Sequence, residues 1–317
     1  MKKGMIIALI VAAALILVGG MIVVLGLSFA ADPQADPVTM LMEREHSISE
    51  TFDSVLVDTE DCNVDFVVFE GTADPHVIIK ERESTRHSVT VEDGILKIKM
   101  IDSRKWRDHI GISWESMEMT VYLPQKQYEN VRVTTDTGRI RIPEVFSARE
   151  LALRSDTGRV VCDAKVSEDL SCFTDTGSIT VRGAGPAKMR LVSNTGNITL
   201  SGMTGKEIGL QNNTGRTEAE DVNCEVLACE SNTGDVVLRG VLADRLLQID
   251  TDTGDVRIED CDAGNTNIET DTGDVSGHFL TPKWFSANSD TGKVTVPNTP
   301  EGNDCRIETD TGDIHFE

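Results

Sequence analysis

Apolar and polar residues alternate over short stretches along most of the chain, and the alternation recurs at a nearly constant interval. Around Gly254, apolar residues stand at Leu247 and Ile249 before an Asp-Thr-Gly tripeptide, and at Val256 and Ile258 after it. A period of two is typical of β-strands that bury one face. The pattern therefore predicts two short strands joined by a bend at each tripeptide.

The tripeptide, with Asp or Asn in its first position, occurs ten times at intervals of 19 or 20 residues. Its glycines are Gly138, Gly158, Gly177, Gly196, Gly215, Gly234, Gly254, Gly273, Gly292 and Gly312. The residue two places after glycine is apolar in nine copies of ten, and is mostly β-branched, as strands prefer. The residue three places before glycine is always Thr, Ser or Asn, which suits a narrow corner of a core. Such repetition is typical of a solenoid, in which each unit packs on its neighbours.

Two strands in 19 residues cannot enclose a core alone, but stacked units can. We therefore predict an all-β fold, a parallel β-solenoid of about 19-residue rungs, with equivalent strands about 4.8 Å apart. The alternative is a row of antiparallel hairpins, but the glycine stands one place later than in the Asp-Gly turn that hairpins prefer. In the predicted bend, glycine supplies a positive φ, and Asp or Asn bonds the backbone N–H two residues on.

The repeats occupy residues 131–317, and a less regular region precedes them. Residues 48–130 lack the tripeptide but keep strand patterns such as 64–69 and 117–124, which predicts irregular β coils that cap the solenoid. Residues 31–47, with two prolines and mixed charge, are expected to form a linker. Residues 102–116 hold two of the three tryptophans and a basic cluster, and are expected to protrude as a loop.

The N-terminus carries an uncharged, apolar run at residues 4–27, and we assign residues 1–30 to a membrane anchor. A helix of that length extends about 36 Å, enough for a hydrocarbon core of about 30 Å. Lys2 and Lys3 precede the run, so the positive-inside rule predicts a single-pass protein with a cytoplasmic N-terminus and an extracytoplasmic repeat region. A cleaved signal peptide is the alternative, because Ser28-Phe29-Ala30 resembles a cleavage site. No lipobox cysteine follows the run.

The net charge limits the possible binding partners, and the cysteine positions bear on possible disulfides and metal sites. The net charge of −23 argues against nucleic-acid binding, because phosphates would be repelled. The seven cysteines are odd in number, and those inside the repeats fall in apolar columns, so we expect small core side chains rather than disulfides or a zinc site. They are Cys62, Cys162, Cys172, Cys224, Cys229, Cys261 and Cys305.

The chain has an N-terminal anchor, the segment MEMTVYLP, and many SDTG or TDTG turns that are followed one residue later by Val or Ile. Together these features resemble the bacterial DUF4097 family, whose members are also named putative adhesins. The resemblance covers about residues 48–317. It implies a right-handed β-solenoid at the cell surface, with links to adhesion and envelope stress. It brings no catalytic residues and no cofactor. Asn194, Asn213 and Asn232 depart from the usual Asp, but can make the same local bond.

Two kinds of function remain open. The turn columns place carboxylates in register, and Asp252, Asp255, Asp271 and Asp274 are weak calcium candidates, although Asp can simply close each turn. Hydrolase, nucleotide-binding and zinc-protease motifs are absent. We therefore expect a non-enzymatic, adhesin-like binding or scaffold protein with an unidentified envelope or surface protein or glycan partner. The alternative is a polysaccharide lyase or hydrolase on the same scaffold.

Overall fold

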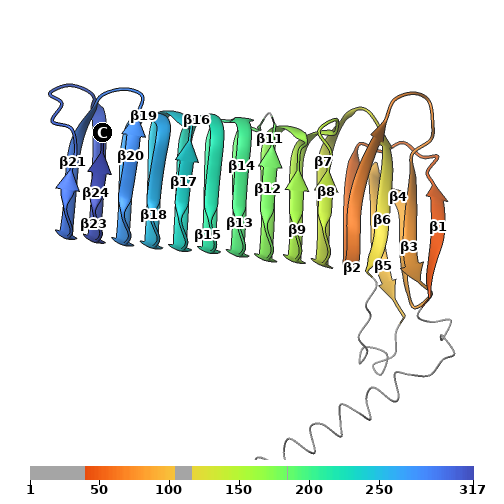
Figure 1. Cartoon of the computed structure of the whole chain (residues 1–317). Helices are drawn as coiled ribbons and strands as arrows, with labels where there is room; N and C mark the ends of the chain where they lie inside the picture. The colour runs from red at the N-terminus through yellow and green to blue at the C-terminus, as the bar shows by residue number, and fades with distance from the viewer. Residues whose placement is uncertain (1–39, 104–115, 184) are drawn as a thin grey trace, which may run out of the picture. The chain divides into compact units, whose positions relative to one another are not determined.

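The computed structural model describes residues 40–103, 116–183 and 185–317 (Figure 1). All regular structure there is β, and apart from Leu41 it lies in the unit Met42–Glu317. Within the described residues, no helix has the length and apolar character needed to cross a membrane. The predicted anchor at residues 1–30 and the core of the predicted loop, residues 104–115, lie outside the described residues.

Each repeat contributes a strand that leads into the tripeptide and a shorter strand that follows it. The first kind forms what we call the long-strand face: β7 Gln127–Thr137, β9 Ser147–Thr157, β11 Lys165–Thr176, β13 Lys188–Thr195, β15 Glu207–Thr214, the second half of β16 Thr217–Thr233, β18 Leu242–Thr253, the second half of β19 Val256–Thr272, β21 Lys283–Thr291 and β23 Asn303–Thr311. The second kind forms the short-strand face: β8 Ile140–Ile142, β10 Val160–Cys162, β12 Ile179–Arg182, β14 Ile198–Thr204, the first half of β16, β17 Val236–Arg239, the first half of β19, β20 Val275–Phe279, β22 Val294–Thr295 and β24 Ile314–Phe316.

Equivalent strands pair in parallel, which confirms the predicted solenoid and excludes the hairpin alternative for the repeats. Thr195 of one tripeptide pairs with Thr214 of the next, and Thr214 with Thr233. The inward side chains of each rung form the core between the two faces. Leu247 and Ile249, named above from the sequence pattern, are fully buried. The register follows the repeat because a slip of one residue would turn the apolar set outward.

The N-terminal region mixes parallel and antiparallel pairing. Its strands are β1 Leu41–Ser47, β2 Ser54–Phe69, β3 His76–Arg82, β4 Thr85–Glu92, β5 Ile95–Asp102 and β6 Met117–Pro124. Strand β2 supplies both faces of one rung and lies between β5 and β6 on one side and β7 and β8 on the other. Strands β3, β4, β5 and β6 are linked antiparallel. Strand β1 pairs with β3, so the end of the expected linker at residues 31–47 is a strand instead of a tether.

The last two rungs are stacked in the reverse of their sequence order. Strand β23 pairs with β19 on one side and β21 on the other, and β24 lies likewise between β20 and β22 (Figure 1). Thr311 therefore pairs with both Thr272 and Thr291. The expectation that every rung packs on the next one in sequence is wrong at this end.

The inward side chains give a physical reason for the reversal. The C-terminal rung contributes Ile307, Ile314 and Phe316, each at most 3% exposed. At paired inward positions the preceding rung has Ala287 beside Ile307 and Val294 beside Ile314, although its Phe285 is larger than Cys305. Placing the more apolar rung inside the stack buries more apolar surface, at about 25 cal/mol per Å².

A buried lysine joins the end rung to the core across the inserted one. The side chain of Lys283 is fully buried, and its ammonium group donates to the Asp262 carboxylate and, at 2.8 Å, to the Ala263 carbonyl. The Thr281 hydroxyl also donates to Asp262, at 2.9 Å. Burial acts to raise the pKa of Asp262, but the bonds from Lys283 and Thr281 outweigh it and hold that pKa below its usual value.

We expect Lys283→Met to cost about 3 kcal/mol of unfolding free energy at neutral pH, near the lower end for a broken buried pair because Asp262 is a quarter exposed. The folded pKa of Asp262 lies below its unfolded value of about 3.9, so the pair stabilises the fold above that pH and loses this contribution as pH falls through the folded pKa. Urea titrations of the two proteins should therefore converge below about pH 4. Lys293→Met, at an exposed lysine of the same rung, is the control; a wild-type advantage over Lys283→Met that persists unchanged in acid would contradict the assignment.

Candidate functional site

The ten predicted turn glycines form one column, in which each approaches the backbone of the adjacent rung. A Cβ built on Gly234 would lie 2.1 Å from the carbonyl oxygen of Gly215. Every glycine of the column would meet a neighbouring carbonyl oxygen at 1.9–2.3 Å. The predicted positive φ is present at eight of the ten, but Gly158 and Gly292 make the same approach without it. Close backbone approach is therefore the requirement that all ten share.

The hydrogen bonds at the turn differ from the prediction. The N–H of Gly234 donates to the carbonyl of Thr253 on the adjacent rung, at 2.8 Å, in place of the expected bond to its own Asn232. The Thr, Ser or Asn three places before glycine is buried in nine of the ten repeats, as expected for a narrow corner, and Ser289 of the end rung is half-buried. Ser155 and Ser193, for example, donate to glycine carbonyls of the adjacent rung at 2.9 and 3.1 Å. The turn is thus held by bonds between rungs.

Two of the four candidate calcium ligands, Asp255 and Asp274, accept backbone N–H groups of adjacent rungs. An oxygen of Asp255 accepts the N–H of Asp274 at 3.0 Å, and an oxygen of Asp274 accepts the N–H of Asp313 at 2.7 Å. Asp252 and Asp271 are exposed in the neighbouring column. Across the described ranges, no group of three or more His, Cys, Asp or Glu is arranged to hold a metal ion. Calcium binding stays a hypothesis for a titration.

Asparagines interrupt the column of turn carboxylates. The Asn194 amide donates to Asp175 at 2.7 Å, and the Asn213 amide donates to Asn194 at 3.2 Å. At the N-terminal end of this column, burial and the neighbouring Asp156 carboxylate raise the pKa of Asp136. The amides supply donors where a further carboxylate would add repulsion, so the three central asparagines relieve stacked charge.

All seven cysteines are free and buried, which agrees with their expected role as small core side chains. Burial raises the pKa of the Cys62, Cys162 and Cys229 thiols to about 12, and also raises that of the other four. The thiolate is the reactive form, so native thiols should be inert near pH 8. We expect an aromatic disulfide reagent to titrate fewer than one thiol per chain in buffer and seven in denaturant. Rapid titration of several thiols in the folded protein would contradict this.

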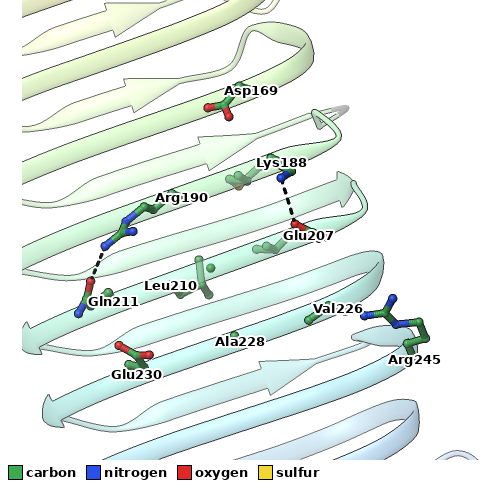
Figure 2. A pocket seen from close by; sticks show the side chains of 13 residues that line it. Asp169, Lys188, Arg190, Glu207, Leu210, Gln211, Val226, Ala228, Glu230 and Arg245 are labelled. Atoms are coloured by element: carbon green, nitrogen blue, oxygen red, sulfur yellow. Dashed lines mark hydrogen bonds and ion pairs between the residues drawn. The ribbon is translucent and has the colours of Figure 1, made fainter.

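The long-strand face carries an open trough that the sequence analysis did not identify. It has a volume of about 550 Å³ and lies over β11, β13, β15, β16 and β18 (Figure 2). Its floor includes Gly209 and Ala228, which stand six places before their turn glycines on neighbouring rungs. Larger side chains rise on either side, so a column of small residues produces the depression.

Charged side chains of both signs line this trough. Lys188 pairs with Glu207 at 3.7 Å, and Arg190 donates to the Gln211 side-chain oxygen at 3.1 Å, as the dashed lines in Figure 2 show. Three further charges, Asp169, Glu230 and Arg245, line it without an ion pair to any described residue. They are available to a polar ligand.

A second depression, of about 890 Å³, continues the trough toward the N-terminal rungs. The two share Asp169 and Lys188, and the floor of the second includes Ala152 and Ser171, again six places before a turn glycine. Arg190 has the same position on the rung between the two floors. The combined surface runs along the stacking direction from β2 to β18. A shallow, elongated surface of this kind suits an extended chain more than a small molecule, since small-molecule sites enclose most of their ligand.

A hydrogen-bonded chain resembling a catalytic relay lies in the N-terminal region. Nδ1 of His87 lies 2.8 Å from an oxygen of Glu81, and Nε2 lies 2.8 Å from the Thr59 hydroxyl. Sequence reasoning missed this chain because β2, β3 and β4 bring its members together. Glu81 is fully buried, and Thr59 and His87 are 3% and 4% exposed, so a substrate has no path to the hydroxyl. Arg44 of β1 completes the network, with Nε 3.3 Å from Glu81. The network joins β1, β2, β3 and β4.

Similar solved structures include proteins described as a "putative adhesin" from Bacteroides fragilis NCTC 9343 (13% identity, 89% of this chain and 99% of that chain, TM-score 0.41) and from Parabacteroides merdae ATCC 43184 (12%, 88% and 96%, 0.41). Another, from Parabacteroides distasonis ATCC 8503, is described as a "Putative lipid binding protein" (12%, 88% and 97%, 0.25). Likeness at this level carries no argument about function. Among curated proteins, no match to the chain was found.

The family comparison is more specific. The family described as Toastrack DUF4097 matches residues 53–221 and 206–317, which together include every turn glycine. The match takes in the N-terminal rungs as well as the repeats, as the resemblance in sequence implied. Because the matched residues cover most of the chain, this chain belongs to the Toastrack DUF4097 family.

Proposed function

We propose that this protein is a non-enzymatic binding or scaffold protein that holds an extended polar partner, a protein or glycan of the cell envelope or surface, along its long-strand face. The trough over β11 to β18 carries the proposal. Its floor is small and open, and Asp169, Glu230 and Arg245 remain available to a ligand. The one relay-like constellation described above is sealed in the interior, which supports binding over catalysis.

The test fills the trough without changing the fold. Ala228→Arg places a long side chain on its floor, and Thr199→Arg places the same side chain on the outer side of the short-strand face. The full-length chain in detergent is incubated with cell-wall and envelope fractions. We expect the wild type and Thr199→Arg to bind and Ala228→Arg to lose at least about tenfold in affinity, about 1.4 kcal/mol. Failure of the wild type to bind any fraction, or equal binding by both variants, would contradict the proposal.

We also propose that residues 4–27 anchor the chain in the membrane and that the rungs lie on the extracytoplasmic side. The uncharged run behind Lys2 and Lys3 supports this. In intact cells or spheroplasts, externally added protease should remove the repeat region and leave a membrane-bound N-terminal fragment. A repeat region that is protected until the cells are lysed would contradict the orientation, and release of the whole chain from the membrane would favour the cleaved signal peptide.

The enzyme alternative has a direct assay. The full-length chain is incubated with acidic polysaccharides, with and without calcium, and new reducing or unsaturated ends are measured. We expect none above a protein-free control. Release of such ends by the wild type would replace the proposed binding function with a polysaccharide lyase or hydrolase.

A further inference from the structure

The rung formed by β21 and β22 ends the described stack and leaves its share of the core uncovered. Val294 is 38% exposed, whereas Ile314 and Val275, at the same position of the two adjacent rungs, are fully buried. Phe285 and Ala287, which face inward on β21, are half-buried. Other rungs cover such positions with a neighbour, so the C-terminal end lacks one layer.

The backbone of this rung is also unpaired along one edge. Among the described residues, β21 pairs with β23 alone and β22 with β24 alone. The edge of β21 carries no charge from Trp284 to Ser289, and the Lys283 ammonium group, which could protect it, is turned inward to Asp262. Proteins usually protect a long edge with charges, proline or a bulge, because unpaired N–H and C=O groups accept another strand.

The charge of this rung indicates which kind of strand can pair with its open edge. Lys283 is buried against Asp262, so the remaining residues 284–295 present one lysine and one aspartate, a net charge of zero in a chain whose net charge is −23. The adjacent C-terminal rung, residues 303–317, carries −4. Two copies of this acidic protein therefore meet with least repulsion at β21 and β22.

We infer that two copies of this chain associate end to end through β21 and β22. A two-fold axis perpendicular to the two faces sets β21 antiparallel to β21 of the second copy, and β22 antiparallel to its own equivalent. The long-strand faces then continue into each other, and Phe285, Ala287 and Val294 enter a shared core. At the opposite end, the outer strand β1 carries Glu43, Arg44 and Glu45, so the contact closes at two copies.

The test compares two lysines at adjacent positions of one strand. Val294→Lys places an ammonium group on the inward side of the end rung, where it faces its equivalent in the second copy. Thr295→Lys adds the same charge on the outward side. Sedimentation equilibrium of the full-length chain in density-matched detergent reports the oligomeric state over a range of concentrations. Thermal unfolding of both variants checks that the monomer stays folded.

We expect a dimer for the wild type and Thr295→Lys, and at least about a tenfold weaker dimer for Val294→Lys. A wild type that stays monomeric at micromolar concentrations would overturn the inference. A dimer equally stable in both variants would overturn it as well, because association would then use another surface such as the N-terminal apolar run. Open-ended growth beyond two copies would contradict the two-fold arrangement.

Discussion

Replacing Gly234 by alanine should destabilise the fold by about 3 kcal/mol or more, because the new methyl group has no space and the backbone is unfavourable for it. Its Cβ would lie 2.1 Å from the carbonyl oxygen and 2.6 Å from the carbonyl carbon of Gly215, and φ of Gly234 is +139°. The Gly215 carbonyl group cannot move away without shifting its rung. Urea and thermal unfolding measure the loss.

Gly71→Ala is the control for backbone conformation. Gly71 also has a positive φ, +110°, but an added Cβ would meet nothing within 4 Å. We expect this variant to lose only the cost of an unfavourable backbone conformation, about 1–3 kcal/mol. Equal losses in the two variants would show that φ alone, and not contact between rungs, requires glycine in the column.

Replacing Glu81 by alanine should cost about 3 kcal/mol, the lower end of the range for removing one partner of a buried ion pair, because Arg44 is 32% exposed. One oxygen of Glu81 accepts both the backbone N–H and ring Nδ1 of His87, at 2.7 and 2.8 Å, and the other lies 3.3 Å from Nε of Arg44. Truncation leaves the backbone N–H and the ring of His87 without their acceptor in a buried site. The free energy of unfolding in urea gives the size of the effect.

Glu83→Ala removes the other acidic partner of the same arginine and serves as the control. Glu83 pairs with Arg44 at 2.6 Å, but both side chains are substantially exposed. An exposed pair contributes about 1 kcal/mol or less. A loss for Glu83→Ala as large as that for Glu81→Ala would show that burial is not what makes the Glu81 network important.

The repeat region was predictable because each rung repeats one local signal. The β-branched column after glycine, the small polar column before it and the tripeptide itself all repeat at 19 or 20 residues. Together they specify which face of each strand is buried, and hence the register that pairs Thr195 with Thr214. The cysteines were assigned to the core for the same reason, since those in the repeats occupy columns that are otherwise apolar.

The features that the sequence pattern did not predict depend on contacts between distant segments. The relay-like chain needs β2 beside β4, with Thr59 and His87 28 residues apart. The trough depends on the small outward residues Gly209 and Ala228 lying side by side in adjacent strands. Their common position six places before glycine was a signal that could have been read, but the depth of the trough depends on the flanking side chains.

The sequence by itself determined the unit of this protein: two strands, a glycine bend and an alternating core, repeated in parallel register. Only the tertiary structure decided the order of the last rungs, since β23 and β21 carry nearly the same signal and either could pair with β19. The choice rests on total burial, because Ile307 and Phe316 gain more from an interior place than Ala287, and on the reach of Lys283 to Asp262. Burial summed over several rungs is a property of the assembled stack that no single repeat encodes.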